Sequence, residues 1–309
     1  QDAVPGAPAM LLEGDAVCQA IAQVREQLAA TLVRPEQHTI YWLSQAGQDG
    51  AVTVHAAPLH VGQMLQEKLF AGKETLVLTG ATLSAESSFA YIRERLGLPD
   101  ADELLLGSPF DYRRAALVYV PTDLPEPTRP GYPQALADAL ADLCRATGGY
   151  TLALFTSHAA LRAVREALQG PLEREGITVL GQGLDGSPQH LLAAFKANPR
   201  MVLLGTASFW EGVDIGSETL KVLVLTRLPF AVPTEPVFAA RAQLFEDWFN
   251  QYMVPQAILR FKQGFGRLIR RRTDRGAVVV LDTRINQRAY GAAFMQSLPP
   301  CTVKSGPAR

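Results

Sequence analysis

The sequence is poor in cysteine and has no excess of either charge. Three cysteines occur among 309 residues, and Cys18, Cys144 and Cys301 form no Cys-x-x-Cys pair. They support neither a disulfide scaffold nor a structural zinc or iron–sulfur site, so a reducing, cytoplasmic setting is expected. Lys and Arg number 29 against 30 Asp and Glu. The net charge of −1 argues against a polycation that coats nucleic acid, although it leaves room for a local basic site.

Long hydrophobic runs and phosphate-binding loops are also missing. No apolar run approaches the ~18 residues that a membrane-spanning helix needs, so no membrane partner is expected. A phosphate-binding loop needs Gly-x-x-x-x-Gly-Lys followed by Ser or Thr, between a strand and a helix. Gly72 and Lys73 come nearest, but Glu67 stands in place of the first glycine and Glu74 in place of the hydroxyl residue. The chain begins with Gln1 and carries no signal-peptide pattern, so we expect a segment of a longer protein.

The apolar pattern predicts an α/β protein in two parts. In the second part, residues 111–309, short apolar runs alternate with helical patterns, which is typical of a parallel sheet with helices on both faces. We expect its strands at 115–120, 150–155, 177–180, 201–205, 221–226 and 277–282. We expect its helices at 134–146, 159–169, 188–197 and, as a long pair, 235–269. This part is therefore predicted to be one complete doubly wound domain.

The first part, residues 1–110, is predicted to be the end of another domain with a preceding segment. A loose lead-in of about ten residues comes before its first helix. Its elements are a helix near 15–32, strands at 38–43 and 51–57, a short helix near 61–70, a strand at 74–79 and a helix to about 96. The first part is therefore predicted to close with one buried strand and a helix.

Ligands of open parallel sheets bind at the carboxyl ends of strands, and four such places carry polar residues. Their hydroxyl groups can donate to phosphates, although each is also a common helix cap. These hydroxyl residues are Thr79, Thr82, Thr156, Ser157, Thr206 and Ser208. Glu211 and Asp214 flank Gly212, where the backbone can approach a ligand and a carboxylate can hold a ribose hydroxyl or a metal-bound water, or cap a turn. Trp210 can stack on a base or fill the core, and His158 has no carboxylate nearby in sequence to make it a catalytic base.

The fourth place is strongly basic. Asp274 is the one acid between residues 260 and 275, against seven cations: Arg260, Lys262, Arg267, Arg270, Arg271, Arg272 and Arg275. Arg267 and Arg270 are three residues apart, so on a helix they share a face, with Gln263 one turn back. Two guanidinium groups together suit a polyphosphate whose charge grows during phosphoryl transfer. The simpler alternative is a solvated basic face or a helix end.

Together, these segments resemble the C-terminal half of a DinG-type helicase, in the XPD-like branch of superfamily 2. Residues 79–83, Thr-Gly-Ala-Thr-Leu, resemble the family's motif III, with Gly80 in place of the usual Ser. Residues 154–157, Leu-Phe-Thr-Ser, resemble the start of the second motor domain, and 209–214 resemble motif V. Residues 263–270, with Asp274, Gly276 and 281–284, resemble motif VI and the strand after it, and 227–236 resemble the family's Leu-Pro-Phe segment. The resemblance spans about residues 40–294.

The resemblance implies an ATP-dependent DNA helicase that moves 5′→3′ on single-stranded DNA. In such enzymes, two RecA-like motor domains hold ATP between them. The resemblance makes Arg267 and Arg270 the arginine fingers on the γ-phosphate, with Gln263 in support. It places Glu211, Gly212 and Asp214 at the nucleotide edge of the cleft. The residues that it places toward single-stranded DNA are Thr79, Thr82, Thr156, Ser157, Thr206 and Trp210.

The phosphate-binding loop and the Asp-Glu-x-His metal motif belong to the family's first motor domain, and neither is in these residues. We therefore expect ATP and Mg²⁺ to be held mainly by that domain, as a partner within the same full-length chain, with no metal site here. We also expect this chain alone to hydrolyse no ATP. Two alternatives stay open. One is a stand-alone single-stranded nucleic-acid-binding or regulatory module, and the other is an α/β enzyme whose basic helix grips a different phosphorylated substrate.

Overall fold

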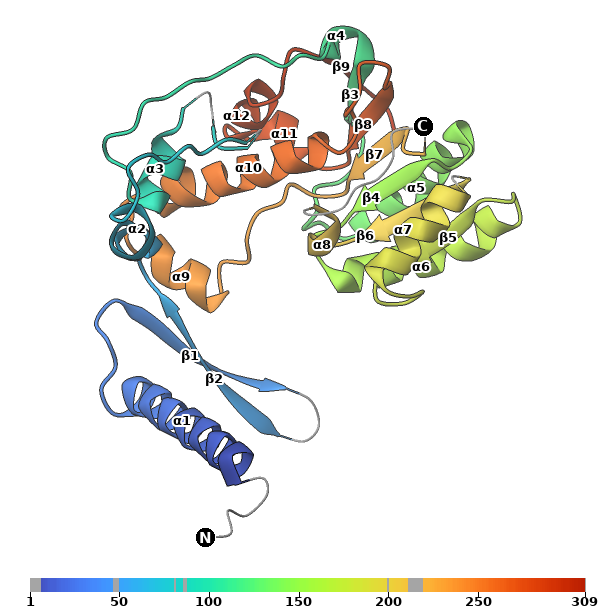
Figure 1. Ribbon diagram of the computed structural model, residues 1–309. Helices are drawn as coiled ribbons and strands as arrows, with labels where there is room; N and C mark the ends of the chain where they lie inside the picture. The colour runs from blue at the N-terminus through green and yellow to red at the C-terminus, as the bar shows by residue number, and fades with distance from the viewer. Residues whose placement is uncertain are drawn as a thin grey trace. The chain divides into compact units, whose positions relative to one another are not determined.

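The computed structural model describes residues 7–46, 50–80, 82–85, 88–198, 200–210 and 219–308 (Figure 1). The chain divides into two compact units. The smaller unit comprises Gln1–Lys73, Arg95–Gly97 and Val232–Leu244, and the larger comprises Glu74–Glu94, Leu98–Ala231 and Phe245–Arg309. Among the described residues, no helix is both long enough and apolar enough to cross a membrane. A boundary between two motor domains near residue 110 stays a prediction.

The smaller unit contains the predicted first helix and hairpin, which are both confirmed. Its elements are α1 (Ala7–Leu32), β1 (Thr39–Ala46), β2 (Ala51–Pro58), α2 (Val61–Leu65), the π-helical turn Gln66–Phe70 and α9 (Pro236–Ala242). Strands β1 and β2 are antiparallel, with Thr39 opposite Pro58. The Tyr41 hydroxyl donates to the carbonyl of Ala30 in α1, at 3.4 Å. Helix α1 begins at Ala7, eight residues earlier than predicted, because Ala, Met and Leu favour helix.

The larger unit is built on seven parallel strands in the order β5-β6-β4-β7-β8-β3-β9. These strands are β3 (Ala116–Pro121), β4 (Thr151–Leu154), β5 (Thr178–Gly181), β6 (Met201–Gly205), β7 (Val222–Leu225), β8 (Gly276–Val280) and β9 (Thr302–Gly306). All six strands predicted for the second part are confirmed. The sequence analysis missed β9, because this edge strand contains Lys304 and Ser305 and lacks the apolar run of a buried strand.

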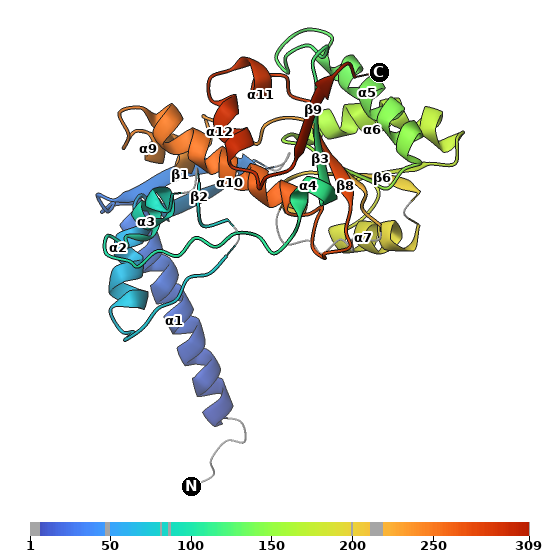
Figure 2. The same cartoon turned by 90° about the horizontal axis from the view of Figure 1, so that it is seen from above.

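Helices cover both faces of this sheet, as predicted for a doubly wound domain. Val222 and Val224 of β7 pack in one core with α5 (Tyr132–Thr147) and α6 (His158–Glu173), while Leu223 and Leu225 pack in a second core on the other face. That second core includes side chains of α7 (Pro188–Ala197), α10 (Val254–Phe265) and α12 (Gly291–Gln296). Figure 2 shows α5 and α6 on the side of the sheet opposite α7. Shorter helices complete the unit: α3 (Ala90–Leu96), α4 (Tyr112–Ala115), α8 (Ala207–Trp210) and α11 (Arg284–Gln287).

The prediction of a strand at 74–79 is wrong. These residues are extended but belong to no strand, and Leu76, Val77 and Leu78 are 41%, 78% and 46% exposed. A run of this composition forms a strand only when a neighbouring strand supplies hydrogen bonds and covers its side chains. No such neighbour lies among the described residues, so the run stays in water.

The structure also differs from the long helical pair predicted at 235–269. It consists of α9, a π-helical turn at Phe249–Met253 and α10, which ends at Phe265. Arg267 and Arg270 therefore lie on the turn after the helix, and the prediction that they share a helix face is wrong. Asp274 explains the early end: its Oδ2 accepts from the backbone N–H groups of Arg270 and Arg271, at 2.8 and 2.7 Å. This local hydrogen bonding replaces the helical pattern.

Candidate functional site

Three neighbouring strands end side by side and are followed by polar residues. β5 is followed by Gln182, β6 by Thr206, and β4 by Phe155 and then Thr156. The sheet register aligns the end of β4 with that of β6, and the N–H of Phe155 donates to the carbonyl of Gly205 at 2.8 Å. Thr156, Ser157, Thr206, Ser208, His158 and Gln182, which follow these strand ends, are called the carboxyl edge below. The structure thus brings together three of the hydroxyl residues predicted to face DNA.

Four residues of the carboxyl edge, Gln182, Thr206, Ser208 and His158, are joined by a network of hydrogen bonds. Gln182 Oε1 accepts from the backbone N–H of Thr206 at 2.7 Å and from its hydroxyl at 3.0 Å. Gln182 Nε2 donates to Ser208 Oγ at 2.7 Å. His158 Nε2 lies 3.2 Å from Thr206 Oγ1. Thr206 is buried, whereas Ser208 and His158 are exposed, so the network joins one buried hydroxyl to groups that reach solvent.

Ser157 has a separate role at the start of α6. Its Oγ accepts from the N–H of Ala160 at 3.3 Å, so it is the N-cap of this helix. The capping role that the sequence left open for Ser157 is therefore confirmed. Its binding role stays a prediction, because a capping oxygen can still face a ligand.

An ion pair supports the loop that carries Gln182. The Arg165 guanidinium donates to both oxygens of Asp185, at 2.7 and 2.6 Å, and Asp185 Oδ2 also accepts from the N–H of Gly181 at 2.7 Å. Burial alone raises the pKa of Asp185, but the hydrogen bonds from Arg165 and Gly181, with the guanidinium charge, outweigh it and lower that pKa. The carboxylate therefore stays ionised and holds Gly181, which precedes Gln182.

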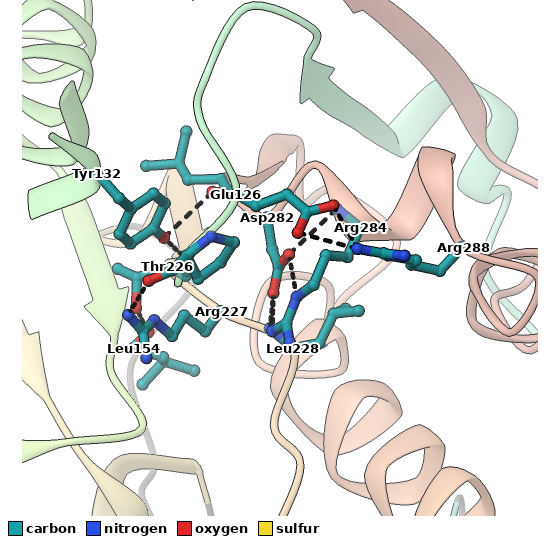
Figure 3. A network of polar contacts seen from close by, with 11 residues as sticks. Glu126, Tyr132, Leu154, Thr226, Arg227, Leu228, Asp282, Arg284 and Arg288 are labelled. Carbon is teal, nitrogen blue, oxygen red and sulfur yellow. Dashed lines mark hydrogen bonds and ion pairs between the residues drawn. The ribbon is translucent and has the colours of Figure 1, made fainter. Parts of the chain in front are cut away.

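The next two strands along the sheet, β7 and β8, end in a buried clamp, shown in Figure 3. The Tyr132 hydroxyl shares its one hydrogen between the carbonyls of Thr226 and Leu281, so it bridges the ends of both strands. Burial raises the pKa of Tyr132 above its ordinary value, which keeps this hydroxyl a donor. Asp282 is fully buried, and its Oδ2 accepts from the N–H of Leu228 at 2.9 Å. The clamp fixes the loops that follow β7 and β8.

A second group of contacts holds the loop after β3, which contains Glu126 and Pro127, against this clamp. Arg288 Nη2 lies 2.8 and 3.0 Å from the two carboxylate oxygens of Glu126. Arg227 Nη2 donates to the carbonyl of Pro127 at 2.6 Å, and its guanidinium carbon lies 5.3 Å from the centre of the Tyr132 ring. Figure 3 shows both arginines beside the Tyr132–Asp282 clamp. These contacts are structural, and each arginine already has a partner.

A cavity of about 760 Å³ lies against the end of α10. Gln263 and Arg267 line it, together with Thr82 from the segment that resembles motif III and Ser84 directly after that segment. Gln263 Oε1 is buried and accepts no hydrogen bond from any described residue. Lys262 Nζ donates to the carbonyl of Ser84 at 2.6 Å, and burial lowers the pKa of Lys262. Two of the three predicted catalytic residues therefore share one cavity, which has an unsatisfied polar atom in its wall.

The remaining predicted site residues do not join these two places. Arg270 is absent from the residues that line the cavity, and its backbone N–H is held by Asp274. Thr79 is exposed in the extended run that precedes the cavity segment. The predictions for Glu211, Gly212 and Asp214, and for the side chain of Trp210, lie outside the described residues.

Comparisons with known proteins identify the family. Residues 140–301 match the family described as the helicase C-terminal domain. This chain belongs to that family. It is 38% identical over 252 residues to the ATP-dependent DNA helicase YoaA of Escherichia coli, covering 80% of this chain and 39% of that protein. It is 36% identical over 301 residues to the ATP-dependent helicase DinG of Mycobacterium tuberculosis, covering 93% of this chain and 44% of that protein.

A third relative is named for a different activity. The chain is 37% identical over 267 residues to the 3′-5′ exonuclease DinG of Bacillus subtilis, covering 83% of this chain and 29% of that protein. The helicase C-terminal chain thus spans less than half the length of these three relatives. The resemblance to DinG-type helicases is confirmed.

Solved structures support the fold. The Xpd4 structure from S. tokodaii matches with a TM-score of 0.57 at 16% identity, covering 82% of this chain and 49% of that one. A structure of XPD in its apo form matches with a TM-score of 0.52 at 18% identity, covering 70% of this chain and 46% of that one. The predicted RecA-like fold with an XPD-like arrangement is confirmed.

Sequence reasoning missed Gln182 and the contact made by His158. A signal for Gln182 exists, because it is a polar residue placed directly after a short buried strand. It carries no hydroxyl and no charge, and it acquires its role only because β5 lies beside β6. The fold also gives His158 a partner, the hydroxyl of Thr206, which lies 48 residues further along the chain. Its partner is therefore a hydroxyl group and not the carboxylate that a catalytic base would need.

Proposed function

We propose that this chain is the C-terminal motor portion of an ATP-dependent DNA helicase with 5′→3′ polarity. It binds single-stranded DNA at the carboxyl edge and supplies Arg267 and Arg270 to ATP held by the first motor domain. The observation that carries the proposal is the cavity at the end of α10, where Gln263 and Arg267 of the motif VI segment meet Thr82 of the motif III segment. In this scheme the cavity is the side of the nucleotide cleft that this chain contributes.

The wall of the cavity that carries Arg267 and Gln263 suits a phosphate group, whereas much of the remaining lining is apolar. The planar guanidinium of Arg267 suits the charge that spreads over the transferred phosphoryl group. Gln263 lines the same cavity, and its buried Oε1 has no hydrogen-bond donor among the described residues, so a small rotation of the side chain would offer an acceptor to a ribose hydroxyl or an ordered water. ATP supplies the phosphoanhydride whose cleavage drives movement along the strand. We assign the Mg²⁺ ligands and the phosphate-binding loop to the first motor domain.

The exposed apolar run at residues 76–78 supports the assignment of residues 1–110 to the end of a first motor domain. Leu76, Val77 and Leu78 have the composition of a strand buried on both faces, yet Val77 is 78% exposed. Apolar side chains gain free energy on burial, at about 25 cal/mol per Å². In the full-length protein, this run would add a strand to the sheet of the first motor domain, and Thr79 and Thr82 would then follow a strand end.

The carboxyl edge fits a DNA backbone. Phosphate oxygens accept hydrogen bonds only, and Thr156, Ser157 and Ser208 present hydroxyl donors at an edge where parallel sheets bind ligands. These groups carry no charge, so the salt-dependent part of the affinity must come from the cations of the helicase C-terminal domain. We assign that role to the exposed cations Arg271, Arg272 and Arg275.

The test compares the 309-residue chain with the full-length protein that contains it. The chain alone is expected to bind a labelled oligothymidylate, with an affinity that falls steeply between about 50 and 200 mM salt. It is expected to hydrolyse no ATP, whereas the full-length protein hydrolyses ATP with stimulation by single-stranded DNA. Polarity is read from unwinding of a partial duplex with a 5′ or a 3′ tail. DNA-stimulated ATP turnover by the chain alone that survives Arg267→Ala would overturn the proposal.

A further inference from the structure

We propose that Gln182 is a positioning residue of the carboxyl edge, which holds Thr206 and makes the hydroxyl of Ser208 a donor for a backbone phosphate. The inference rests on the proposed binding of single-stranded DNA and deepens it. It assigns a phosphate contact to Ser208 and a role to a residue that touches no DNA itself. The inference rests on three hydrogen bonds of the Gln182 side-chain amide, which donates one and accepts two.

The orientation of the Gln182 amide follows from chemistry. A backbone N–H can only donate, so the Gln182 atom that lies 2.7 Å from the Thr206 nitrogen must be the amide oxygen. The amide nitrogen then faces Ser208 Oγ, at 2.7 Å, and donates to it. No other arrangement satisfies both contacts, so the side chain is held in one orientation.

The direction of the remaining hydrogen bonds follows in turn. The Thr206 hydroxyl has one hydrogen, and it is donated to Gln182 Oε1 at 3.0 Å. The contact of 3.2 Å with His158 must therefore be a bond in which Nε2–H of the imidazole donates to Thr206 Oγ1. A histidine carries this hydrogen both when it is protonated and in one neutral tautomer, so the network does not depend on the charge of His158.

Ser208 is the end of the network that faces solvent. Its oxygen accepts from Gln182, so its own hydrogen is left to point outward, and the residue is exposed. A group that presents a hydrogen outward matches a ligand that only accepts, as a phosphodiester oxygen does. A base edge offers both donors and acceptors, so it does not require a group that can only donate. The phosphate backbone is therefore the ligand of the Ser208 hydroxyl.

The surroundings hold both ends of the network in place. Asp185, bound by Arg165, fixes the N–H of Gly181 directly before Gln182. On the other side, the turn from β6 into α8 is anchored by Phe209, which is fully buried. Gln182 therefore joins two rigid segments, and its removal leaves each of them folded but no longer aligned with the other.

The experiment measures oligothymidylate affinity and amide exchange in the 309-residue chain. Ser208→Ala is expected to weaken binding roughly tenfold, the usual effect of losing a hydrogen bond to a charged group. Because the serine is neutral, the slope of log affinity against log salt should stay unchanged. Gln182→Met, which keeps the length but removes both polar atoms, should weaken binding to a similar extent and speed exchange of the Thr206 amide by about tenfold.

A double-variant cycle separates positioning from direct contact. If Gln182 acts through Ser208, then Gln182→Met/Ser208→Ala should bind much more tightly than the product of the two single effects predicts. Ser208→Thr, which keeps a hydroxyl, should restore most of the affinity. Gln23→Met, the same substitution on an exposed position of α1, is the matched control and should change nothing. Thermal melting of each variant shows whether it is folded. Because Ser208 is exposed, Ser208→Ala is expected to fold even if Gln182→Met does not.

The outcomes distinguish this inference from the function on which it rests. Failure of the wild-type chain to bind single-stranded DNA would overturn the proposed function and the phosphate role of Ser208 with it. Intact wild-type binding with unchanged affinity in Ser208→Ala, or with fully additive effects in the double variant, would overturn this inference alone. Unchanged exchange of the Thr206 amide in Gln182→Met would remove the positioning role of Gln182.

Discussion

Asp282 binds Arg284 through two hydrogen bonds, from Nε to Oδ1 at 2.9 Å and from Nη2 to Oδ2 at 2.6 Å. The carboxylate is fully buried, while the Arg284 side chain is 21% exposed. The two residues belong to the segment after β8 that resembles the end of motif VI in sequence. Here the pair has a structural use, because the same carboxylate holds the N–H of Leu228 in the loop after β7. The loops at the ends of two strands therefore depend on one acid.

Loss of this acid should destabilise the larger unit strongly. Asp282→Ala leaves the Arg284 guanidinium and the Leu228 N–H without their partner, and removing one member of a buried pair costs about 3 kcal/mol or more in free energy of unfolding. The surface pair of Glu126 and Arg288 is the matched comparison, and Glu126→Ala should cost less than about 1 kcal/mol. Urea unfolding followed by circular dichroism gives both values. Equal costs for the two variants would contradict the buried clamp.

The ion pair between Arg165 and Asp185 should make stability depend on acid pH. Because the folded-state pKa of Asp185 lies below its ordinary value, the ionised carboxylate stabilises the fold at neutral pH. This contribution is present above the unfolded-state pKa of ~3.9 and is lost as the pH falls through the lower folded-state pKa. Asp185→Asn should therefore be less stable than wild type by about 1–2 kcal/mol at pH 7.

The difference between wild type and Asp185→Asn should shrink as the pH falls below ~4, since protonated Asp185 no longer holds Arg165. Denaturant unfolding at a series of pH values measures this difference directly. Asp123→Asn serves as the control, because Asp123 accepts from the N–H of Ala308 and forms no ion pair with an arginine in the part of the chain that the structure describes. A difference that stays constant from neutral to acid pH would show that the charge of Asp185 has no stabilising role.

Gly205 should be essential for the carboxyl edge, because Phe209 packs where its side chain would be. A Cβ at position 205 would lie 2.6 Å from Phe209 Cγ and 2.7 Å from Phe209 Cβ. Gly205→Ala must displace the start of α8, at a cost of about 1–3 kcal/mol for overpacking, and should weaken DNA binding because Thr206 and Ser208 move with it. Gly170→Ala is the control: nothing lies within 4 Å of its Cβ position inside α6, and the substitution should stabilise the helix. Normal stability of Gly205→Ala would disprove the close approach.

The sequence predicted the sheet well because most of its strands are buried on both faces. Runs such as Leu152–Leu154 and Val222–Leu225 have no polar alternation, so their composition alone indicates a central parallel strand. The run at 74–79 has the same composition, yet it forms no strand, because strand formation also needs a neighbour that local sequence does not encode. Edge strand β9 is the opposite case. It has a neighbouring strand, β3, but it lacks the apolar composition that would predict a strand.

The candidate site, like the sheet, was predictable from the sequence only in part. Hydroxyl residues after strands were predictable, since the end of an apolar run locates the edge of the sheet. The contact partners were not, because Gln182 meets Thr206 only through the order of β5 and β6 in the sheet. The position of Arg270 depended on where α10 ends, and Asp274 decides that through hydrogen bonds to the backbone of Arg270 and Arg271. Such a local cap competes with helix propensity and is difficult to weigh from sequence.

The two motif VI arginines should differ in their effect on ATP turnover. Arg267 lines the cavity together with Gln263, whereas Arg270 does not line it. In the full-length protein, Arg267→Ala should lower kcat by about 10³-fold, the size of an arginine-finger effect, while Arg270→Ala should cost less. Arg267→Lys should rescue little, because an ammonium cannot make the paired hydrogen bonds of a guanidinium. Arg174→Ala, at an exposed position directly after α6, is the control. Steady-state ATPase assays with saturating single-stranded DNA measure all four variants, and an Arg270→Ala defect equal to or larger than that of Arg267→Ala would place the nucleotide outside the cavity.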